Sequence, residues 1–305
     1  MVYGHHVSER KSMPGDIIKK IIGAVEKDKR RRYINLFFTI LFVFIIAYVT
    51  LSVNIIYMER KETYHPDKDM YTTPATMGIF YEDVDLRTKD GQLINAWFMP
   101  SKDAKVTILY CHGTSGNLSD ELDRINFFHT FNVNFMIFDY RGYGKSSGRP
   151  SEKGFYQDAL AAYDFLISRN DVDKEKIVVI GESLGGPVAV NLCLHRKVKA
   201  LVLESSIVSL TLIAQKLYPF LPVEILLSEK FDALSKIKNI HIPKLLVHGI
   251  DDERVSFNDA LKLYYAAPQP KEFLPFRGAH NDNIYKISAD YKAELVKFFQ
   301  ENNIF

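Results

Sequence analysis

The stretch that decides the fold of this 305-residue chain is Ile180-Gly181-Glu182-Ser183-Leu184-Gly185-Gly186-Pro187. It contains the pattern G-x-S-x-G between a strand-like run, Lys176–Ile180, and a helix-like stretch, Gly186–Leu194. Glycines two residues before and two after the serine permit a tight strand-to-helix turn, which exposes the hydroxyl and points a helix N-terminus at it. We therefore interpret Ser183 as a nucleophile. The alternative is a helix N-cap serine in a glycine-rich turn.

Apolar runs alternate with helical patterns from residue 79 to the C-terminus. The strand-like runs are Ile94–Met99, Val106–Tyr110, Phe135–Phe138, Lys176–Ile180, Ala200–Leu203, Lys244–Val247 and Phe273–Phe276. The helix-like stretches lie around residues 118–131, 155–168, 184–196, 208–217, 230–238, 257–266 and 284–300. Short apolar strands separated by helices are typical of an α/β fold with a mostly parallel central sheet flanked by helices. Asp90-Gly91 predicts a β-hairpin at the start of this domain.

A serine hydroxyl is a weak nucleophile at neutral pH, so the chain must also supply a base and an acid that orients it. In folds with this serine turn the acid and then the histidine follow the serine in sequence. The loop after Lys244–Val247 carries Asp252, our choice for the acid, with neighbouring Asp251 and the more distant Glu204 as alternatives. The only histidine after His248 is His280, which we predict to be the base.

The oxyanion of the tetrahedral intermediate needs backbone N–H donors. One donor is expected from Leu184, the residue after the nucleophile. The other is expected from the loop after Val106–Tyr110, where Thr114 is the predicted donor. His112, in the same loop, is interpreted as a structural residue.

Five motifs in this order, YCHGTSGN, FDYRGYGKSSG, IGESLGG, VHGIDDERV and GAHND, make residues 80–300 resemble the α/β-hydrolase fold. The resemblance is strongest to membrane-anchored serine hydrolases of the bud-emergence-46-like branch. It implies Ser183, Asp252 and His280 as the triad, with Thr114 and Leu184 as oxyanion donors. It also implies a scaffold role for the turn that contains Asp139, Arg141, Gly142 and Gly144. Related protein depalmitoylases carry N-terminal cysteines that this chain lacks.

Residues 34–57 form an uncharged apolar run of 24 residues with tyrosines at both ends. At about 1.5 Å per residue, a helix of this length spans a hydrocarbon core of about 30 Å. It is longer than the core of a cleavable signal peptide and begins only after 33 residues, which favours a permanent anchor. A hydrophobic hairpin or monotopic insertion is the alternative. We thus expect a basic tail (1–33), a transmembrane helix (34–57), a linker (58–78) and a hydrolase domain (79–305).

The flanking charges predict the orientation of the anchor. Five basic residues lie within residues 27–32, against Arg60, Lys61 and Lys68 on the other side. The positive-inside rule then places the N-terminus in the cytosol and the hydrolase domain in the lumen or outside the cell. Before the anchor, isoleucines and Val25 recur at helical spacing over residues 17–25, as expected for a short amphipathic helix on the membrane surface or else a partly disordered tail.

Composition limits the other possibilities. A formal net charge of +2 gives no indication of a nucleic-acid partner. The two cysteines, Cys111 and Cys193, lie in apolar stretches and indicate neither a disulfide framework nor a zinc site. We expect no cofactor and no metal.

The substrate class follows only from the surroundings of the site. Residues 205–240 contain an apolar insertion whose residues Ile213, Leu217, Phe220, Leu221, Leu226 and Leu227 could line an acyl pocket, contact the membrane or simply pack over the sheet. Together with an anchor, this insertion favours a hydrophobic ester or thioester, either a lipid or an acylated protein. The competing function is a catalytically inactive interaction protein of the same fold, although such proteins usually lack a triad residue.

One N-x-S/T sequon, Asn117-Leu118-Ser119, lies in the predicted oxyanion loop. A glycan there would crowd the entrance of the active site. We therefore expect that the sequon is unoccupied, or that the orientation predicted from the charges is wrong.

Overall fold

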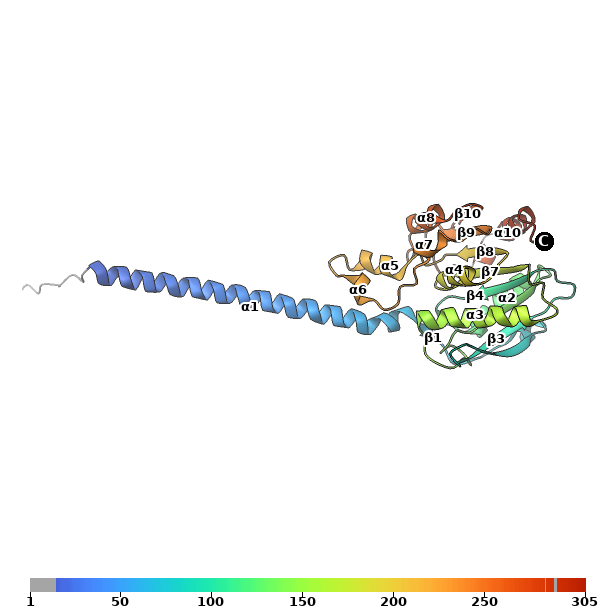
Figure 1. Cartoon of the computed structure of the whole chain (residues 1–305), viewed down its shortest axis with the longest axis horizontal. Helices are drawn as coiled ribbons and strands as arrows, with labels where there is room; N and C mark the ends of the chain where they lie inside the picture. The colour runs from blue at the N-terminus through green and yellow to red at the C-terminus, as the bar shows by residue number, and fades with distance from the viewer. Residues whose placement is uncertain (1–14, 283, 288–289) are drawn as a thin grey trace, which may run out of the picture. The chain divides into compact units, whose positions relative to one another are not determined.

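The computed structural model describes residues 15–282, 284–287 and 290–305, which divide into two compact units at Ile55 and Ile56. The described residues of the first unit are all helical and are part of α1, Gly15–Thr63, a single helix of 49 residues that continues into the second unit (Figure 1). Residues 15–33 are therefore helical and continuous with the predicted span, so the expected short amphipathic helix is not a separate element. Residues 1–14 of the tail lie outside the described residues.

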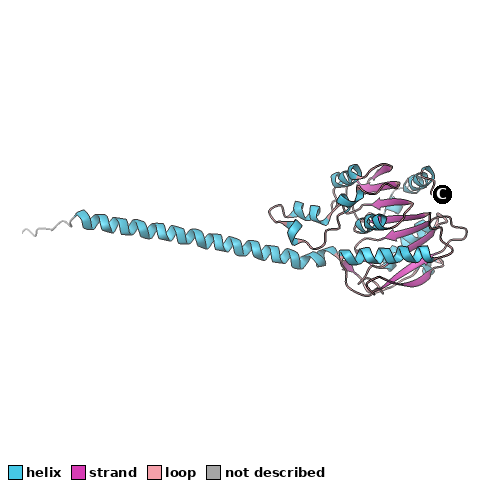
Figure 2. Cartoon of the chain, in the orientation of Figure 1, coloured by secondary structure: helices cyan, strands magenta, loops and turns pink. Residues whose placement is uncertain are grey.

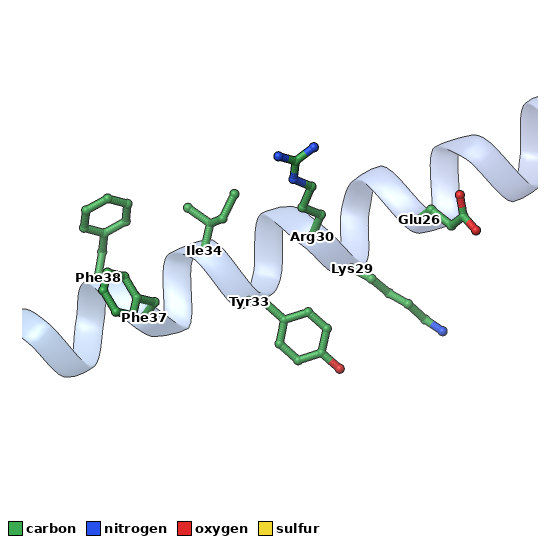
Figure 3. A pocket seen from close by; sticks show the side chains of 7 residues that line it. All are labelled: Glu26, Lys29, Arg30, Tyr33, Ile34, Phe37 and Phe38. Carbon is green, nitrogen blue, oxygen red and sulfur yellow. The ribbon is translucent and has the colours of Figure 1, made fainter.

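Helix α1 is long and apolar enough to cross a membrane. Between residues 26 and 38 a shallow hollow lies along the helix, and the side chains there change from charged to aromatic (Figure 3). The residues along it are Glu26, Lys29, Arg30, Tyr33, Ile34, Phe37 and Phe38. This change coincides with the predicted start of the span at residue 34, where a tyrosine suits the water–lipid boundary.

The second unit is built on an eight-stranded sheet with the order β10-β9-β8-β7-β4-β6-β3-β2. Figure 2 shows the strands of this unit in magenta with helices beside them. The strands are β2 Glu82–Arg87, β3 Leu93–Met99, β4 Thr107–Cys111, β6 Asn134–Phe138, β7 Ile177–Glu182, β8 Ala200–Glu204, β9 Lys244–Gly249 and β10 Lys271–Phe276. Pairing is parallel from β10 to β6, whereas β3 is antiparallel to both β6 and β2. The predicted hairpin at Asp90-Gly91 joins β2 to β3, and the predicted parallel sheet is confirmed.

Helices cover both faces of the sheet because its central strands are buried on both sides. One core cluster joins the sheet to α3 Glu152–Ser168, α4 Gly185–His195, α7 Ala233–Ile237 and α8 Phe257–Ala266. The other joins it to α2 Leu122–His129, α9 Ile284–Ile287 and α10 Tyr291–Glu301. Alternate residues of β4 belong to opposite clusters, as the two-residue period of a strand requires. The apolar insertion forms two short helices, α5 Leu210–Leu217 and α6 Val223–Leu226.

Residues 58–78, expected to form a linker, are folded against the domain. Residues 58–63 are the last turns of α1, and Pro74–Met77 is a 3₁₀ turn. Between them β1, His65–Pro66, pairs in parallel with β5, Ser115–Gly116. The sequence did not predict this strand, because two residues are too few to show the alternating pattern of a strand.

Candidate active site

Ser183 occupies the predicted turn between β7 and α4 with a positive φ of +49°. Non-glycine residues rarely adopt this conformation, which is found where the fold needs a sharp exposed turn. The flanking glycines are required by close contacts: a Cβ on Gly185 would lie 2.0 Å from the carbonyl oxygen of Cys111, and one on Gly181 would lie 2.5 Å from the carbonyl oxygen of Gly185. The turn is thus held tightly against the end of β4.

The predicted base and acid lie beside this serine. Nε2 of His280 is 2.9 Å from Oγ of Ser183, and Nδ1 of His280 is 2.7 Å from Oδ2 of Asp252. The His280 ring is nearly buried, and the Asp252 side chain is buried behind it. When Nδ1–H donates to Asp252, Nε2 is left to accept the hydrogen bond of the Ser183 hydroxyl.

The carboxylate of Asp252 is held in place by the backbone. Its Oδ1 accepts hydrogen bonds from the N–H groups of Arg254, at 2.9 Å, and Val255, at 2.8 Å. Burial alone would raise the pKa of Asp252, but the hydrogen bonds from His280 and the Val255 N–H outweigh it and lower the pKa below its usual value. Asp252 therefore remains ionised at neutral pH.

The two alternative acids are placed differently. Asp251 is exposed to solvent. Glu204, at the end of β8, is buried and accepts hydrogen bonds from the hydroxyls of Tyr110, at 3.0 Å, Tyr285, at 2.7 Å, and Tyr291. Burial raises the pKa of Glu204. The structure thus brings Asp252, rather than either alternative, to His280.

The predicted oxyanion donors flank the nucleophile. Leu184 follows Ser183 directly and lies at the N-terminus of α4. Thr114 lines the same cavity as Ser183, and its neighbour Gly113 is so close that an added Cβ would lie 3.7 Å from Cβ of Ser183. The two predicted donors thus belong to the backbone segments that lie beside Ser183.

The cavity at Ser183 has a volume of about 220 Å³ and a largely polar lining. Carboxylates of Asp120, Glu121, Asp123, Glu182 and Asp282 surround it, together with the guanidinium groups of Arg124 and Arg254. In the described part of the chain, none of the six apolar residues proposed from the sequence lines this cavity. These six residues therefore do not form an acyl pocket within this cavity.

The sequence analysis proposed none of the seven charged residues named above, and three of them form ion pairs with one another. Arg124, from α2, contacts the carboxylate of Glu121 and lies 3.0 Å from that of Glu182. Burial raises the pKa of Glu121 to about 7 even though Arg124 opposes the shift. Glu182 occupies the variable position just before the serine in G-x-S-x-G, so the motif does not specify it. Glu121 and Arg124 lie in the helix-like stretch 118–131, where nothing in the sequence indicated that they face the active site.

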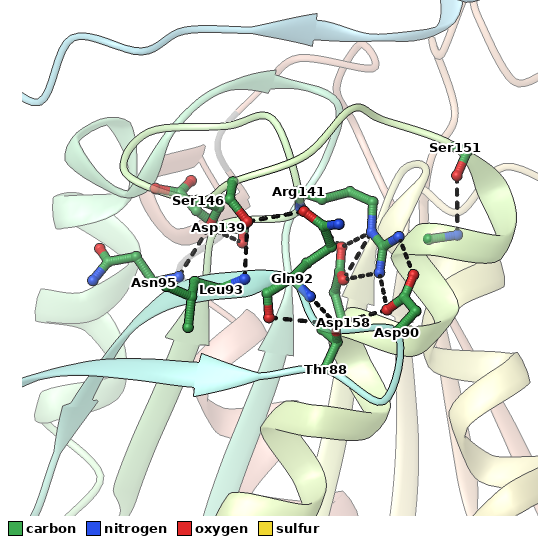
Figure 4. Close-up of polar contacts among 12 residues, drawn as sticks. Thr88, Asp90, Gln92, Leu93, Asn95, Asp139, Arg141, Ser146, Ser151 and Asp158 are labelled. Carbon is green, nitrogen blue, oxygen red and sulfur yellow. Dashed lines mark hydrogen bonds and ion pairs between the residues drawn. The ribbon is translucent and has the colours of Figure 1, made fainter.

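The predicted scaffold residues support the turn after β6. Arg141 binds Asp158, with Nη2 2.8 Å from Oδ1, and Asp90 in the β2–β3 hairpin, with Nη1 2.7 Å from Oδ2 (Figure 4). Gly142 and Gly144 both have positive φ, and a Cβ on Gly144 would lie 2.0 Å from Oδ2 of Asp139. Oδ1 of Asp139 accepts a hydrogen bond from the N–H of Leu118 at 3.1 Å. This bond connects the turn after β6 to the 3₁₀ turn Leu118–Glu121, which precedes α2.

His112 packs inside the domain, as expected for a structural residue. Its ring lies 4.7 Å from that of Tyr140, measured between ring centroids, and burial lowers its pKa to about 4. Among the described residues, no group of three or more His, Cys, Asp or Glu side chains could hold a metal ion.

The sequon asparagine is committed to internal hydrogen bonds. The Asn117 side chain is 1% exposed; its Nδ2 donates to the carbonyl of Asp69 at 2.9 Å, and its Oδ1 accepts from the N–H of Ser119 at 2.8 Å. A glycan on Nδ2 would have to displace this packing. The folded domain therefore has no room for a glycan at Asn117.

The chain is similar in sequence to proteins of several organisms. The model of a family described as alpha/beta hydrolase fold matches residues 106–237. An uncharacterized protein of Mycobacterium tuberculosis is 34% identical over 227 residues, which is 73% of this chain and 81% of that protein. Protein bem46 of Schizosaccharomyces pombe is 30% identical over 280 residues, 85% of this chain and 92% of that protein.

The fold is also found among solved structures. An esterase of Pyrococcus furiosus superposes with a TM-score of 0.66 at 21% sequence identity, covering 78% of this chain and 98% of the esterase. An α/β-hydrolase of Vibrio vulnificus superposes with a TM-score of 0.63 at 21% identity, covering 82% and 92% of the two chains. At these identities the likeness establishes the fold alone.

Proposed function

This chain belongs to the bem46-like branch of the α/β-hydrolase family, and from that premise we propose that it is a membrane-anchored serine hydrolase. It would cleave an ester or thioester through an acyl-enzyme formed on Ser183. The observation that carries the proposal is the continuous hydrogen-bonded chain Ser183–His280–Asp252, with distances of 2.9 Å and 2.7 Å. Its geometry matches what nucleophilic catalysis by serine requires.

The reaction follows from this geometry. Oγ of Ser183 attacks the substrate carbonyl carbon while Nε2 of His280 takes the hydroxyl proton. The negative charge that develops on the carbonyl oxygen is stabilised by the N–H groups of Thr114 and Leu184. His280 then gives its proton to the departing alcohol or thiol, leaving the acyl group on Ser183. A water molecule then attacks the acyl carbon while His280 takes its proton. His280 returns this proton to Oγ of Ser183 as the bond to the acyl carbon breaks, which releases the acid and the free serine.

We propose a hydrophobic acyl ester or thioester as the substrate. The cavity of about 220 Å³ is smaller than the roughly 300–1,000 Å³ of pockets that enclose whole drug-sized ligands. Its charged lining suits the polar side of such a substrate, the carbonyl and its alcohol or thiol leaving group. A long acyl chain would then extend beyond this cavity.

Membrane attachment through residues 34–57 is the second part of the proposal. Helix α1 supports it by length and composition. The insertion adds exposed apolar residues: Leu217 is 68% exposed, Phe220 91% and Ile225 84%. Glu59, two residues past the predicted span, accepts a hydrogen bond from Ser228, which follows this insertion. Because the insertion is thus close to the end of the span, we propose that its exposed apolar residues contact the lipid surface.

A fluorophosphonate probe, which reacts with activated serines, tests the enzymatic function. The wild-type protein is expected to be labelled covalently, and Ser183→Ala is expected not to be. Folded wild-type protein that resists labelling would instead support the inactive interaction protein. Esters and thioesters of increasing acyl length, offered in detergent micelles, would then identify the substrate class.

A further inference from the structure

The segment between the anchor helix and the domain contacts the loop that carries the predicted oxyanion donor. We propose that residues 64–72 are a positioning element of the active site, which holds the oxyanion loop, residues 113–119, in its working conformation. The inference rests on the proposed function, because the loop matters only if Ser183 forms an oxyanion. It assigns a catalytic consequence to a segment that lies outside residues 106–237, the part matched by the family model.

Backbone hydrogen bonds join the two segments as a short parallel ladder. The N–H of His65 donates to the carbonyl of Thr114 at 3.1 Å, and the N–H of Asp67 donates to the carbonyl of Gly116, also at 3.1 Å. Gly116 has a positive φ of +77°, so the loop turns sharply directly beside this ladder. An isolated two-residue pairing is weak, and further contacts must fix it.

Side chains of the loop provide those contacts. Nδ2 of Asn117 donates to the carbonyl of Asp69 at 2.9 Å, and Oγ of Ser119 donates to the carbonyl of Thr72 at 3.1 Å. The Ser119 hydroxyl oxygen also accepts the N–H of Tyr71 at 3.2 Å. Asn117 and Ser119 are both buried, so these bonds are shielded from competition with water.

The segment is also fixed on its anchor side, so it does not act as a slack tether. Glu59 accepts hydrogen bonds from Oγ of Ser228, at 2.9 Å, and from the N–H of Glu229, at 2.8 Å. The ring of Tyr64 is buried, with its centroid 5.2 Å from that of Phe155. Held on its anchor side, the segment has a defined position from which to support the loop.

Thr114 is the residue on which this support converges. Its carbonyl accepts two hydrogen bonds, one from the N–H of His65 and one from the hydroxyl of Tyr143 at 2.7 Å. The carbonyl fixes the backbone on one side of the Thr114 Cα, and the N–H predicted to bind the oxyanion lies on the other side. An oxyanion hole is effective only when its donors are oriented before the reaction, so loosening this carbonyl is expected to slow the chemical step.

His65→Pro in the full-length protein tests the proposal, because it removes the N–H that bonds to Thr114. His65→Ala is the matched control, since the His65 side chain is exposed and alanine keeps the N–H. Tyr143→Phe removes the second hydrogen bond without a backbone change. Tyr163→Phe is its control, because the Tyr163 hydroxyl also donates to a backbone carbonyl, that of Lys197.

The readout is the rate of fluorophosphonate labelling, followed to its end point in detergent, together with kcat and KM for an ester. Removing an oxyanion donor costs about 10²–10³ in kcat, and a displaced donor is expected to cost at least about tenfold. We therefore expect His65→Pro and Tyr143→Phe to be labelled at least about tenfold more slowly, with a lower kcat, an unchanged KM and full final stoichiometry. Both control variants should retain the wild-type rate.

Wild-type labelling rates in both His65→Pro and Tyr143→Phe would overturn the inference. If His65→Pro fails to fold, its final stoichiometry falls, and Tyr143→Phe then decides the question alone. A reduced stoichiometry with an unchanged rate in Tyr143→Phe would indicate a purely structural role and would also overturn it. Failure of the wild type itself to be labelled would refute the proposed function instead, so the two failures are distinguishable.

Discussion

Nδ1 of His280 lies 2.7 Å from Oδ2 of Asp252, and the opposite oxygen of the same carboxylate is held by two backbone N–H groups. The two residues come from the loops after β10 and β9, which are neighbouring parallel strands. Their side chains meet because parallel neighbours end at the same edge of the sheet. The carboxylate thereby fixes both the tautomer and the orientation of the imidazole that faces Ser183.

Asp252→Asn is therefore expected to reduce kcat by about 10³–10⁴, because an amide at this position favours the wrong imidazole tautomer. Asp251→Asn, a change at the exposed neighbour, should leave kcat within about twofold of the wild type. Steady-state hydrolysis of a soluble ester measures both. Since the pKa of Asp252 lies below its usual value, its protonation should not contribute to the acid limb of the wild-type profile above pH 5. Equal rates in Asp252→Asn and Asp251→Asn would contradict the assignment.

The sequence was sufficient for features that are local or follow from strand order. Ser183 was recognisable because Gly181 and Gly185 are both required by a turn that admits no Cβ. Asp252 and His280 could then be chosen because each lies in the loop after a strand that the sequence predicts, and parallel strands bring their carboxyl ends together. These inferences needed no knowledge of side-chain packing.

The features that escaped prediction depend on long-range contacts. The pairing of His65–Pro66 with Ser115–Gly116 joins residues 50 positions apart through only two residues on each side. Such a pairing leaves no periodic pattern in either segment. Arg124 likewise reaches Glu182 at the end of β7 only because α2 packs on β6 of the same sheet, and an arginine in a helix is usually a solvent-exposed residue.

Gly185→Ala tests the close contact that shapes the serine turn. An added Cβ would lie 2.0 Å from the Cys111 carbonyl oxygen, so the start of α4 must move. Overpacking of this kind costs about 1–3 kcal/mol, which corresponds to a fall in Tm of about 2–12 °C in a domain of this size. Gly23→Ala is the control, because open space surrounds Gly23 in α1. Thermal unfolding in detergent should show a fall only for Gly185→Ala, and an unchanged Tm would contradict the tight turn.

Glu121→Gln tests the buried charge beside the nucleophile. Burial raises the pKa of Glu121 from 4.5 to about 7, so the folded state binds this proton more tightly than the unfolded state does. The contribution of this group to stability is therefore complete below pH 4.5 and is lost as the pH rises to about 7. Glutamine cannot ionise, so the variant should gain about 1–3 kcal/mol relative to the wild type between these pH values.

Thermal unfolding at pH 4.5 and pH 7.5 measures this gain as a change in the Tm difference between variant and wild type. Glu175→Gln is the control, because the Glu175 side chain is 66% exposed and its surface pair with Lys197 contributes little. A Tm difference that is constant with pH would show that Glu121 is ionised throughout. A difference that falls with pH would show that Arg124 stabilises the charged form more than burial destabilises it.

Phe220→Trp tests whether the apolar insertion contacts lipid. Phe220 is 91% exposed, whereas the native Trp97 is fully buried and should give an emission that lipids do not quench. In vesicles of brominated phosphatidylcholine, the new tryptophan should be quenched if it enters the acyl region. Tyr265→Trp, at a residue that is 73% exposed on α8, should remain unquenched. If each variant has the same emission in brominated and in ordinary vesicles, the insertion does not contact the membrane.

The orientation of the anchor is testable by glycosylation, although Asn117 cannot report it. Because the Asn117 amide is buried and hydrogen-bonded on both sides, the wild-type protein should show no glycosidase-sensitive mobility shift in either orientation. A sequon built by Lys102→Asn with Ala104→Thr lies instead in the exposed turn between β3 and β4. The excess of basic residues before the span predicts that this turn lies in the lumen, and this variant is then expected to gain one glycan in microsomes. If the double variant remains unmodified while protease digests its hydrolase domain in sealed microsomes, the domain is cytosolic and the orientation predicted from the flanking charges is wrong.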